Sequence, residues 1–196
     1  LRIDVALPED DIALELKKLY RRMQRPVDPM HAMAVIDIEH PRLRFRYREA
    51  DGEHYVYAED PAGACLAGYT VFNRLIEVNK RTDPHLRAPH SKYAPAYRRQ
   101  GIASLVYRWW LDGGRNLITG VRQSPASHAL WHSLAADYPL YYVQLHDNGC
   151  ASWAGRCHRR CGRRSIPACC CLARMGVWSI SCIKPVVSIS RQRQRF

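Results

Sequence analysis

The interpretation of this sequence depends on one stretch, Tyr93-Ala94-Pro95-Ala96-Tyr97-Arg98-Arg99-Gln100-Gly101-Ile102-Ala103. Its first half is typical of the end of a strand, and Ile102 begins a run whose apolar residues recur at helical spacing. The first turn of a helix leaves backbone N–H groups without partners and carries the positive end of the helix dipole. Gly101 lets a ligand approach this backbone closely, and Arg98 and Arg99 add positive charge. The stretch therefore predicts an anion site of the kind that suits a pyrophosphate.

The residues after this stretch alternate between helix and strand patterns. Apolar side chains recur at i, i+3, i+4, i+7 and i+8 from Ile102 to Trp110, which predicts a helix with one apolar face. Gly113-Gly114 is typical of the end of such a helix. Three more elements are expected: a strand over 117–121, a helix over 127–136 and a strand over 140–145.

The residues before the stretch predict a short strand, a helix and then an antiparallel meander. The helix is expected after Pro8, because apolar residues recur on one face as far as Met23. Over 42–48 arginine alternates with apolar residues, which is typical of a strand with one solvated face rather than of an anion site. Asp51-Gly52 indicates a hairpin within a meander that continues to residue 78. The predicted fold class is thus α/β (α+β), with a mixed, largely antiparallel central sheet flanked by helices.

The stretch resembles motif A of the GNAT N-acetyltransferases, Arg/Gln-x-x-Gly-x-Gly/Ala after an apolar-x-Pro-x-aromatic lead-in. In that family these residues bind the pyrophosphate of acetyl-coenzyme A. The resemblance is close over 93–111 and covers most of 1–146 in the order of its elements. It implies a GNAT-like fold with acetyl-CoA as cosubstrate, no metal, and a cofactor-binding set made of Tyr93, Arg98, Arg99, Gln100, Gly101, Ile102, Ala103 and Ser104.

The resemblance also implies an activity, that of an acyltransferase moving the acetyl group of acetyl-CoA to an amine. Direct attack by a neutral amine needs no covalent residue, only correct placement and donors to the developing oxyanion. The acceptor is expected to be a small-molecule or peptide amine, with no membrane or nucleic acid as partner, and a homodimer is left open. Two alternatives are a catalytically defunct GNAT-fold domain that binds CoA and a nucleic-acid- or zinc-binding protein acting through its tail.

The sequence departs from the family where a tyrosine serves as general acid. Trp131 falls at that position, and an indole N–H is a far weaker acid than a phenol. We therefore interpret Trp131 as a core residue and predict that Tyr138, Tyr141 or water donates the proton to the thiolate.

The general base is not marked by any motif. Glu77, at the end of the long predicted strand, is the candidate that we name. Glu59 and His90 are the alternatives, with both glutamates equally explained as surface carboxylates.

Residues 149–196 differ sharply in composition from the rest of the chain. They hold 10 of the 30 Lys and Arg, none of the 18 Asp and Glu, and seven of the eight cysteines. We therefore predict an acetyltransferase-like domain over 1–148 and an Arg/Cys-rich tail over 149–196. The tail has three interpretations: frame-shifted or unselected sequence, a zinc site that includes Cys157 and Cys161, or a nucleic-acid surface. We expect 149–175 to lie mostly outside the core, and 177–189 to add a strand at the sheet edge.

Targeting patterns are weak. No apolar run approaches the roughly 18 residues of a membrane span, and the acidic beginning does not resemble a secretory signal. A single cysteine in 1–148 also argues against a disulfide-stapled secreted fold. The expected localisation is cytoplasmic.

Overall fold

The computed structural model describes residues 2–3, 9–74, 86–119, 122–146, 149–153 and 169–172. In these residues the α-helices are α1 (Glu9–Met23), α2 (Ile102–Asp112) and α3 (Pro125–Leu134), and a short 3-10 helix is η2 (Pro95–Tyr97). The strands are β1 (Arg2–Ile3), β2 (Ala34–Ile36), β3 (Arg44–Ala50), β4 (Glu53–Asp60), β5 (Cys65–Asn73), β6 (Leu86–Tyr93), β7 (Asn116–Ile118), β8 (Arg122–Gln123), β9 (Leu140–His146), β10 (Gly149–Trp153) and β11 (Cys169–Leu172). None of the described helices is long and apolar enough to span a bilayer.

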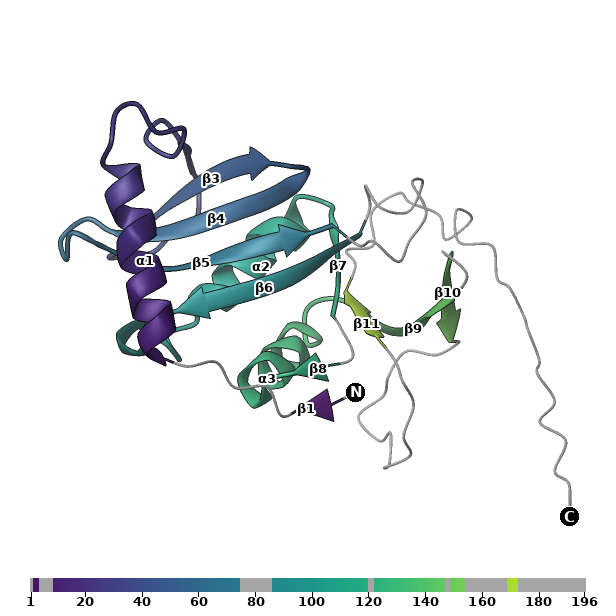
Figure 1. The fold of residues 1–196 in the computed structure, drawn as a ribbon. Helices are drawn as coiled ribbons and strands as arrows, with labels where there is room; N and C mark the ends of the chain where they lie inside the picture. The colour runs from purple at the N-terminus through teal and green to yellow at the C-terminus, as the bar shows by residue number, and fades with distance from the viewer. Residues whose placement is uncertain are drawn as a thin grey trace, which may run out of the picture.

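One large sheet dominates the described part of the chain, in the order β10-β9-β11-β7-β6-β5-β4-β3-β2 (Figure 1). Its pairs are antiparallel except for β6 and β7, which run parallel. A separate parallel pair joins β1 to β8. The expected class, a mixed and largely antiparallel sheet flanked by helices, is confirmed.

The meander from β2 to β6 follows directly from local sequence. Asp51 and Gly52 both have positive φ, 56° and 75°, as a tight two-residue hairpin requires, and they join Ala50 to its partner Glu53. On β3 the side chain of Phe45 is buried. The arginine on either side of it is exposed or only partly buried, so the predicted alternation holds.

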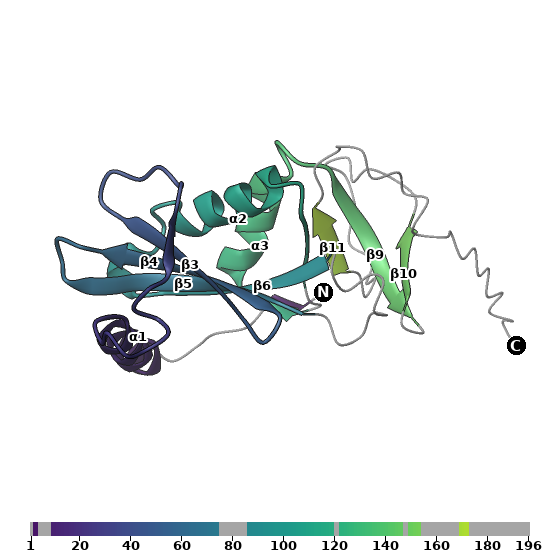
Figure 2. The same cartoon turned by 90° about the horizontal axis from the view of Figure 1, so that it is seen from above.

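The helices cover the two faces of this sheet separately (Figure 2). Ile12 and Leu16 of α1 pack in one apolar cluster with Tyr69 and Val71 of β5. The other face carries α2 and α3, whose buried residues include Trp110 and Trp131. The ring of Trp110 stacks on Phe72 of β5 with centroids 4.0 Å apart. The interpretation of Trp131 as a core residue is confirmed, because only 3% of its surface is exposed.

Two segments of the predicted tail, 149–153 and 169–172, join the sheet. The rest of 149–175 lies outside the described residues, so the expectation that this segment lies mostly outside the core stays a prediction. β10 pairs antiparallel with β9 from Gly149 to Trp153. β11 lies between β7 and β9 and pairs antiparallel with both. An open sheet edge accepts an extended chain with little regard to its sequence, which accounts for β10 at the edge of the sheet but not for β11 between two strands. The strand expected over 177–189 lies outside the described residues, and the domain boundary at 148 stays a prediction.

Candidate functional site

The site begins where β6 separates from β7. β6 pairs with β5 from Ala88 to Tyr93, but with β7 only through Leu86 and Arg87. Figure 1 shows the two strands diverging beyond that point. No strand among the described residues pairs with the second edge of 88–93. Pro89 supplies no N–H and the Tyr93 carbonyl accepts from Arg98 at 3.0 Å, so part of this edge is open to an extended ligand.

The loop from β6 to α2 contains two left-handed residues. Arg99 has φ 59° and Gly101 has φ 75°, with Gln100 between them. Gly101 is the N-cap of α2, and its carbonyl accepts the first helical hydrogen bond, from the Leu105 N–H at 3.0 Å. No side chain caps the helix, so its first N–H groups meet no capping oxygen. Alternation of this kind turns successive backbone N–H groups toward one concave point, which suits an anion.

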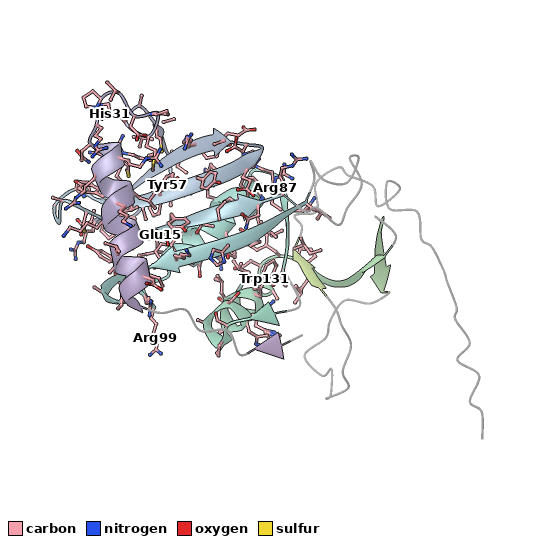
Figure 3. The ribbon with its side chains drawn as sticks, in the orientation of Figure 1. Glu15, His31, Tyr57, Arg87, Arg99 and Trp131 are labelled. Carbon is pink, nitrogen blue, oxygen red and sulfur yellow. The ribbon has the colours of Figure 1, made fainter. Side chains whose placement is uncertain are left out.

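The loop also leaves space for a ligand. A Cβ placed on Gly101 would have no atom within 4 Å, whereas one on Gly68, the partner of Tyr93 on β5, would collide with Tyr93. Residues 98–101 are all exposed, and Figure 3 shows Arg99 extending away from the sheet. Open space, free backbone donors and positive charge together fit a pyrophosphate group.

A network of hydrogen bonds and an ion pair, centred on the buried carboxylate of Asp60, supports the loop. The Tyr97 hydroxyl donates to Asp60 Oδ2 at 2.7 Å, and the same carboxylate accepts from Arg42 at 2.6 Å and from the Gly63 N–H at 2.9 Å. The hydrogen bonds from Tyr97, Gly63 and Arg42 lower the pKa of Asp60 to about 2. The Cys65 sulfur lies 3.3 Å from the Tyr97 oxygen. This network ties η2 to the turn between β4 and β5, and sequence reasoning treated that turn only as a connection.

Two further hydrogen bonds brace the loop within itself. The Gln100 side chain donates to the Ala96 carbonyl at 2.6 Å, and Arg98 Nε donates to the Tyr93 carbonyl at 3.0 Å. Both side chains, which the sequence predicts to contact the ligand, therefore also fix the conformation of the turn. A loop that is already ordered loses little entropy on binding.

The remaining members of the predicted cofactor set lie around this loop. Ile102 is buried in the core, so it offers only its backbone to a ligand. Ala103 and Ser104 are half-buried in the first turn of α2. Tyr93 contacts Thr70, with 3.1 Å between the two hydroxyl oxygens, and burial raises the pKa of Tyr93.

The predicted proton donors are not brought to the loop by any described contact. Tyr138 is buried near the far end of α2, where its hydroxyl donates to Asp112 at 3.1 Å. At about 1.5 Å per residue, Asp112 lies roughly 16 Å along the helix from Gly101. Burial and the bond to Asp112 raise the pKa of Tyr138, so its phenol keeps the proton at neutral pH. Tyr141 lies on β9, but its side chain is outside the described residues.

Neither of the two glutamates predicted as candidate bases is placed by the structure as a free carboxylate beside the loop. Glu77 lies outside the described residues. Glu59 is buried and paired with Arg46 at 2.7 Å, so its interpretation as a surface carboxylate is wrong. A register shift in β4 falls between Ala58 and Glu59 and changes how the two residues pair with β5.

His90 lies on the part of β6 that separates from β7 and is exposed. Desolvation of its ring, with the charge of Lys92, lowers the pKa of His90, while Glu15 opposes the shift. The imidazole is therefore neutral at physiological pH. Beside it Lys92 is paired with Glu15 of α1 at 2.7 Å, and Glu15 also accepts from the Tyr69 hydroxyl at 2.7 Å.

Comparison with known proteins gives a single structural likeness to report. No family model matches the sequence, and no curated protein matches it. Among solved structures, the chain is similar to yncA of Salmonella typhimurium, a candidate acetyltransferase solved with its cofactor acetyl-CoA. The two share 15% sequence identity over 85% of this chain and 88% of the other, with a TM-score of 0.36.

Proposed function

We propose that this chain is a GNAT-like N-acetyltransferase, which transfers the acetyl group of acetyl-CoA to an amine. The observation that carries the proposal is the left-handed Gly101 at the uncapped start of α2, which η2 joins to a strand with one unpaired edge. These features belong to the stretch whose sequence resembles motif A of the GNAT enzymes.

Binding is assigned to backbone groups rather than to side chains. The N–H groups of 99–104 would hold the pyrophosphate, with Arg98 and Arg99 adding charge-assisted contacts. The free edge of 88–93 would pair with the amides of the extended pantetheine arm. Bound acetyl-CoA supplies an activated thioester.

The chain's own part in the reaction is to remove a proton from the amine and to keep the reacting groups together. His90 is the base that we propose, because it lies on the free-edged half of β6 and its ring is neutral at physiological pH. Glu59 is unsuitable, since its carboxylate is engaged by Arg46. Glu77 stays a prediction.

Protonation of the departing thiolate is assigned to Tyr141 or to water. Trp131 is a weak acid and is buried in the core. The Tyr138 hydroxyl already donates a hydrogen bond to Asp112, at the end of α2 that is far from Gly101. A thiolate is a good leaving group, because a thiol ionises with a pKa of only about 8.5, so a weak or absent general acid is compatible with turnover.

The experiment compares two ligands and then tests turnover. Calorimetry should detect binding of acetyl-CoA but not of pantetheine, which lacks the pyrophosphate that the loop is proposed to hold. Release of free thiol is then measured with a panel of small and peptide amines. Binding of acetyl-CoA without thiol release from any amine would identify a defunct CoA-binding domain. Equal affinity for the two ligands would remove the proposed role of the loop.

A further inference from the structure

The exposed side of α3 carries a close pair of histidines. His128 and His132 are four residues apart, which places them one above the other on the helix. Their Nε2 atoms lie 3.1 Å apart, and their ring centroids are separated by 4.4 Å. His132 is exposed and His128 half-buried, whereas Trp131 and Leu134 of the same helix are buried. The pair is therefore open to solutes and is not part of the core.

The separation of the two nitrogens matches that of a chelated ion. Imidazole nitrogens bind zinc at about 2.0–2.1 Å, so two of them 3.1 Å apart form an angle of about 100° at the ion. This angle lies between the octahedral and tetrahedral values. In this structure the 3.1 Å contact is a hydrogen bond between the two rings, so one Nε2 carries a proton, which a bound ion would replace at a separation that the helix already sets.

We propose that His128 and His132 chelate a divalent late first-row transition ion, of the class of Zn²⁺, Ni²⁺ or Cu²⁺. Such ions prefer imidazole nitrogen over the oxygen ligands of harder ions. The described residues contain no group of three or more metal-binding side chains, so the site has two protein ligands and water completes the coordination. It is an open surface site on α3, an element that does not contribute to the loop at Gly101.

The test uses the full chain with its thiols alkylated by iodoacetamide, because the eight cysteines would otherwise bind the same ions. Ni²⁺ is titrated by calorimetry into the wild type, His128→Asn and His132→Asn. Chelation makes the second bond intramolecular, so either substitution should lower the Ni²⁺ affinity by at least about tenfold. Asparagine at these positions leaves the buried face of α3 unchanged, and circular dichroism checks that each variant is folded.

The matched control keeps the number of histidines and changes only their spacing. In a double variant, His132→Asn is combined with Ser133→His, and Ser133 is exposed. We expect this variant to bind Ni²⁺ as weakly as His132→Asn alone. His40→Asn, far from α3 in sequence, should retain the wild-type affinity. Wild-type Ni²⁺ affinity in either single variant, or in the double variant, would overturn the proposal.

Discussion

The two ends of α2 contain the same backbone feature and use it differently. Gly101 at the start and Gly114 just past the end both have φ 75°, and a Cβ on either would meet nothing within 4 Å. At the end, the Gly114 N–H donates to the Leu111 carbonyl at 2.9 Å, and Arg115 lies over Trp110 at 4.2 Å. At the start, no side chain caps the helix. One end is completed by the protein itself, and the other is the end to which we assign the ligand.

The sharpest way to test this contrast is to substitute the two glycines in parallel. Gly101→Ala and Gly114→Ala place the same methyl group on the same left-handed backbone. Each should lower the free energy of unfolding by about 1–2 kcal/mol, because a Cβ is strained at this φ. Only Gly101→Ala should also weaken acetyl-CoA binding, because its methyl group enters the space assigned to the pyrophosphate. We expect the affinity to fall by at least about tenfold, which corresponds to a loss of about 1.4 kcal/mol in binding free energy. Calorimetry and thermal unfolding on both variants measure the two effects, and equal affinities would contradict the assignment.

A substitution at Trp131 perturbs the buried face between α3 and α2 and leaves the start of α2 at Gly101 unchanged. Trp131→Phe leaves part of its buried volume unfilled, and we expect a loss of about 1–3 kcal/mol in the free energy of unfolding. Acetyl-CoA affinity and thiol release should stay within a few-fold of wild type. General acid catalysis is worth about 100-fold or more, so a rate loss of that size at unchanged stability would show that Trp131 is catalytic.

Asp60 tests whether the open end is held in place before a ligand arrives. Its folded pKa of about 2 lies below the usual value near 4, so the charged form is favoured in the fold. The stabilisation is therefore present at neutral pH and is lost as the pH falls from about 4 toward 2. Asp60→Asn should lower the melting temperature by several degrees at pH 7 and flatten its decline over this acid range.

The control for Asp60 is Tyr97→Phe, which removes a single hydrogen bond to the same carboxylate. Acetyl-CoA affinity should fall modestly in both variants because the loop is less well positioned. Unchanged affinity in both, with reduced stability, would show that the network supports the fold alone.

Arg115 gives the smallest expected effect and completes the comparison. Its guanidinium lies over both Trp109 and Trp110, at 4.9 and 4.2 Å from the ring centroids. Arg115→Met keeps the apolar stem and removes the charge, so about 0.5–1 kcal/mol of stability should be lost. Acetyl-CoA affinity should not change. A tenfold loss of affinity would mean that the two ends of the helix are coupled.

Periodic patterns allowed much of the fold to be predicted from sequence. The helix beginning at Ile102 and the hairpin at Asp51-Gly52 both follow from local rules, and both are present. The buried position of Trp131 was inferred because its polar group is a poor acid. The placement of β11 was not predictable, since Cys169–Leu172 pairs with strands whose edges only the complete fold creates.

The site was predicted less completely, for a physical reason. A strand-to-helix turn with glycine is visible in the sequence, so the loop at Gly101 was identified. The contact between Tyr97 and Asp60 joins residues far apart in the chain, and no spacing rule indicates it. Glu59 was taken for a surface residue, because a β-bulge between Ala58 and Glu59 is not visible in the alternation.

The narrow contact between β6 and β7 has a consequence for the order in which the chain folds. β3, β4 and β5 are joined by the short turns 51–52 and 61–64, so their pairing costs little loop entropy. The parallel pairs at Leu86 and Arg87 require the chain to close over residues 88–115, which include α2. Contacts between distant segments form slowly, so we expect the meander to assemble first and the two halves of the sheet to meet last. The loop at Gly101, which lies on that connection, would then reach its final geometry only when the two halves of the sheet pair.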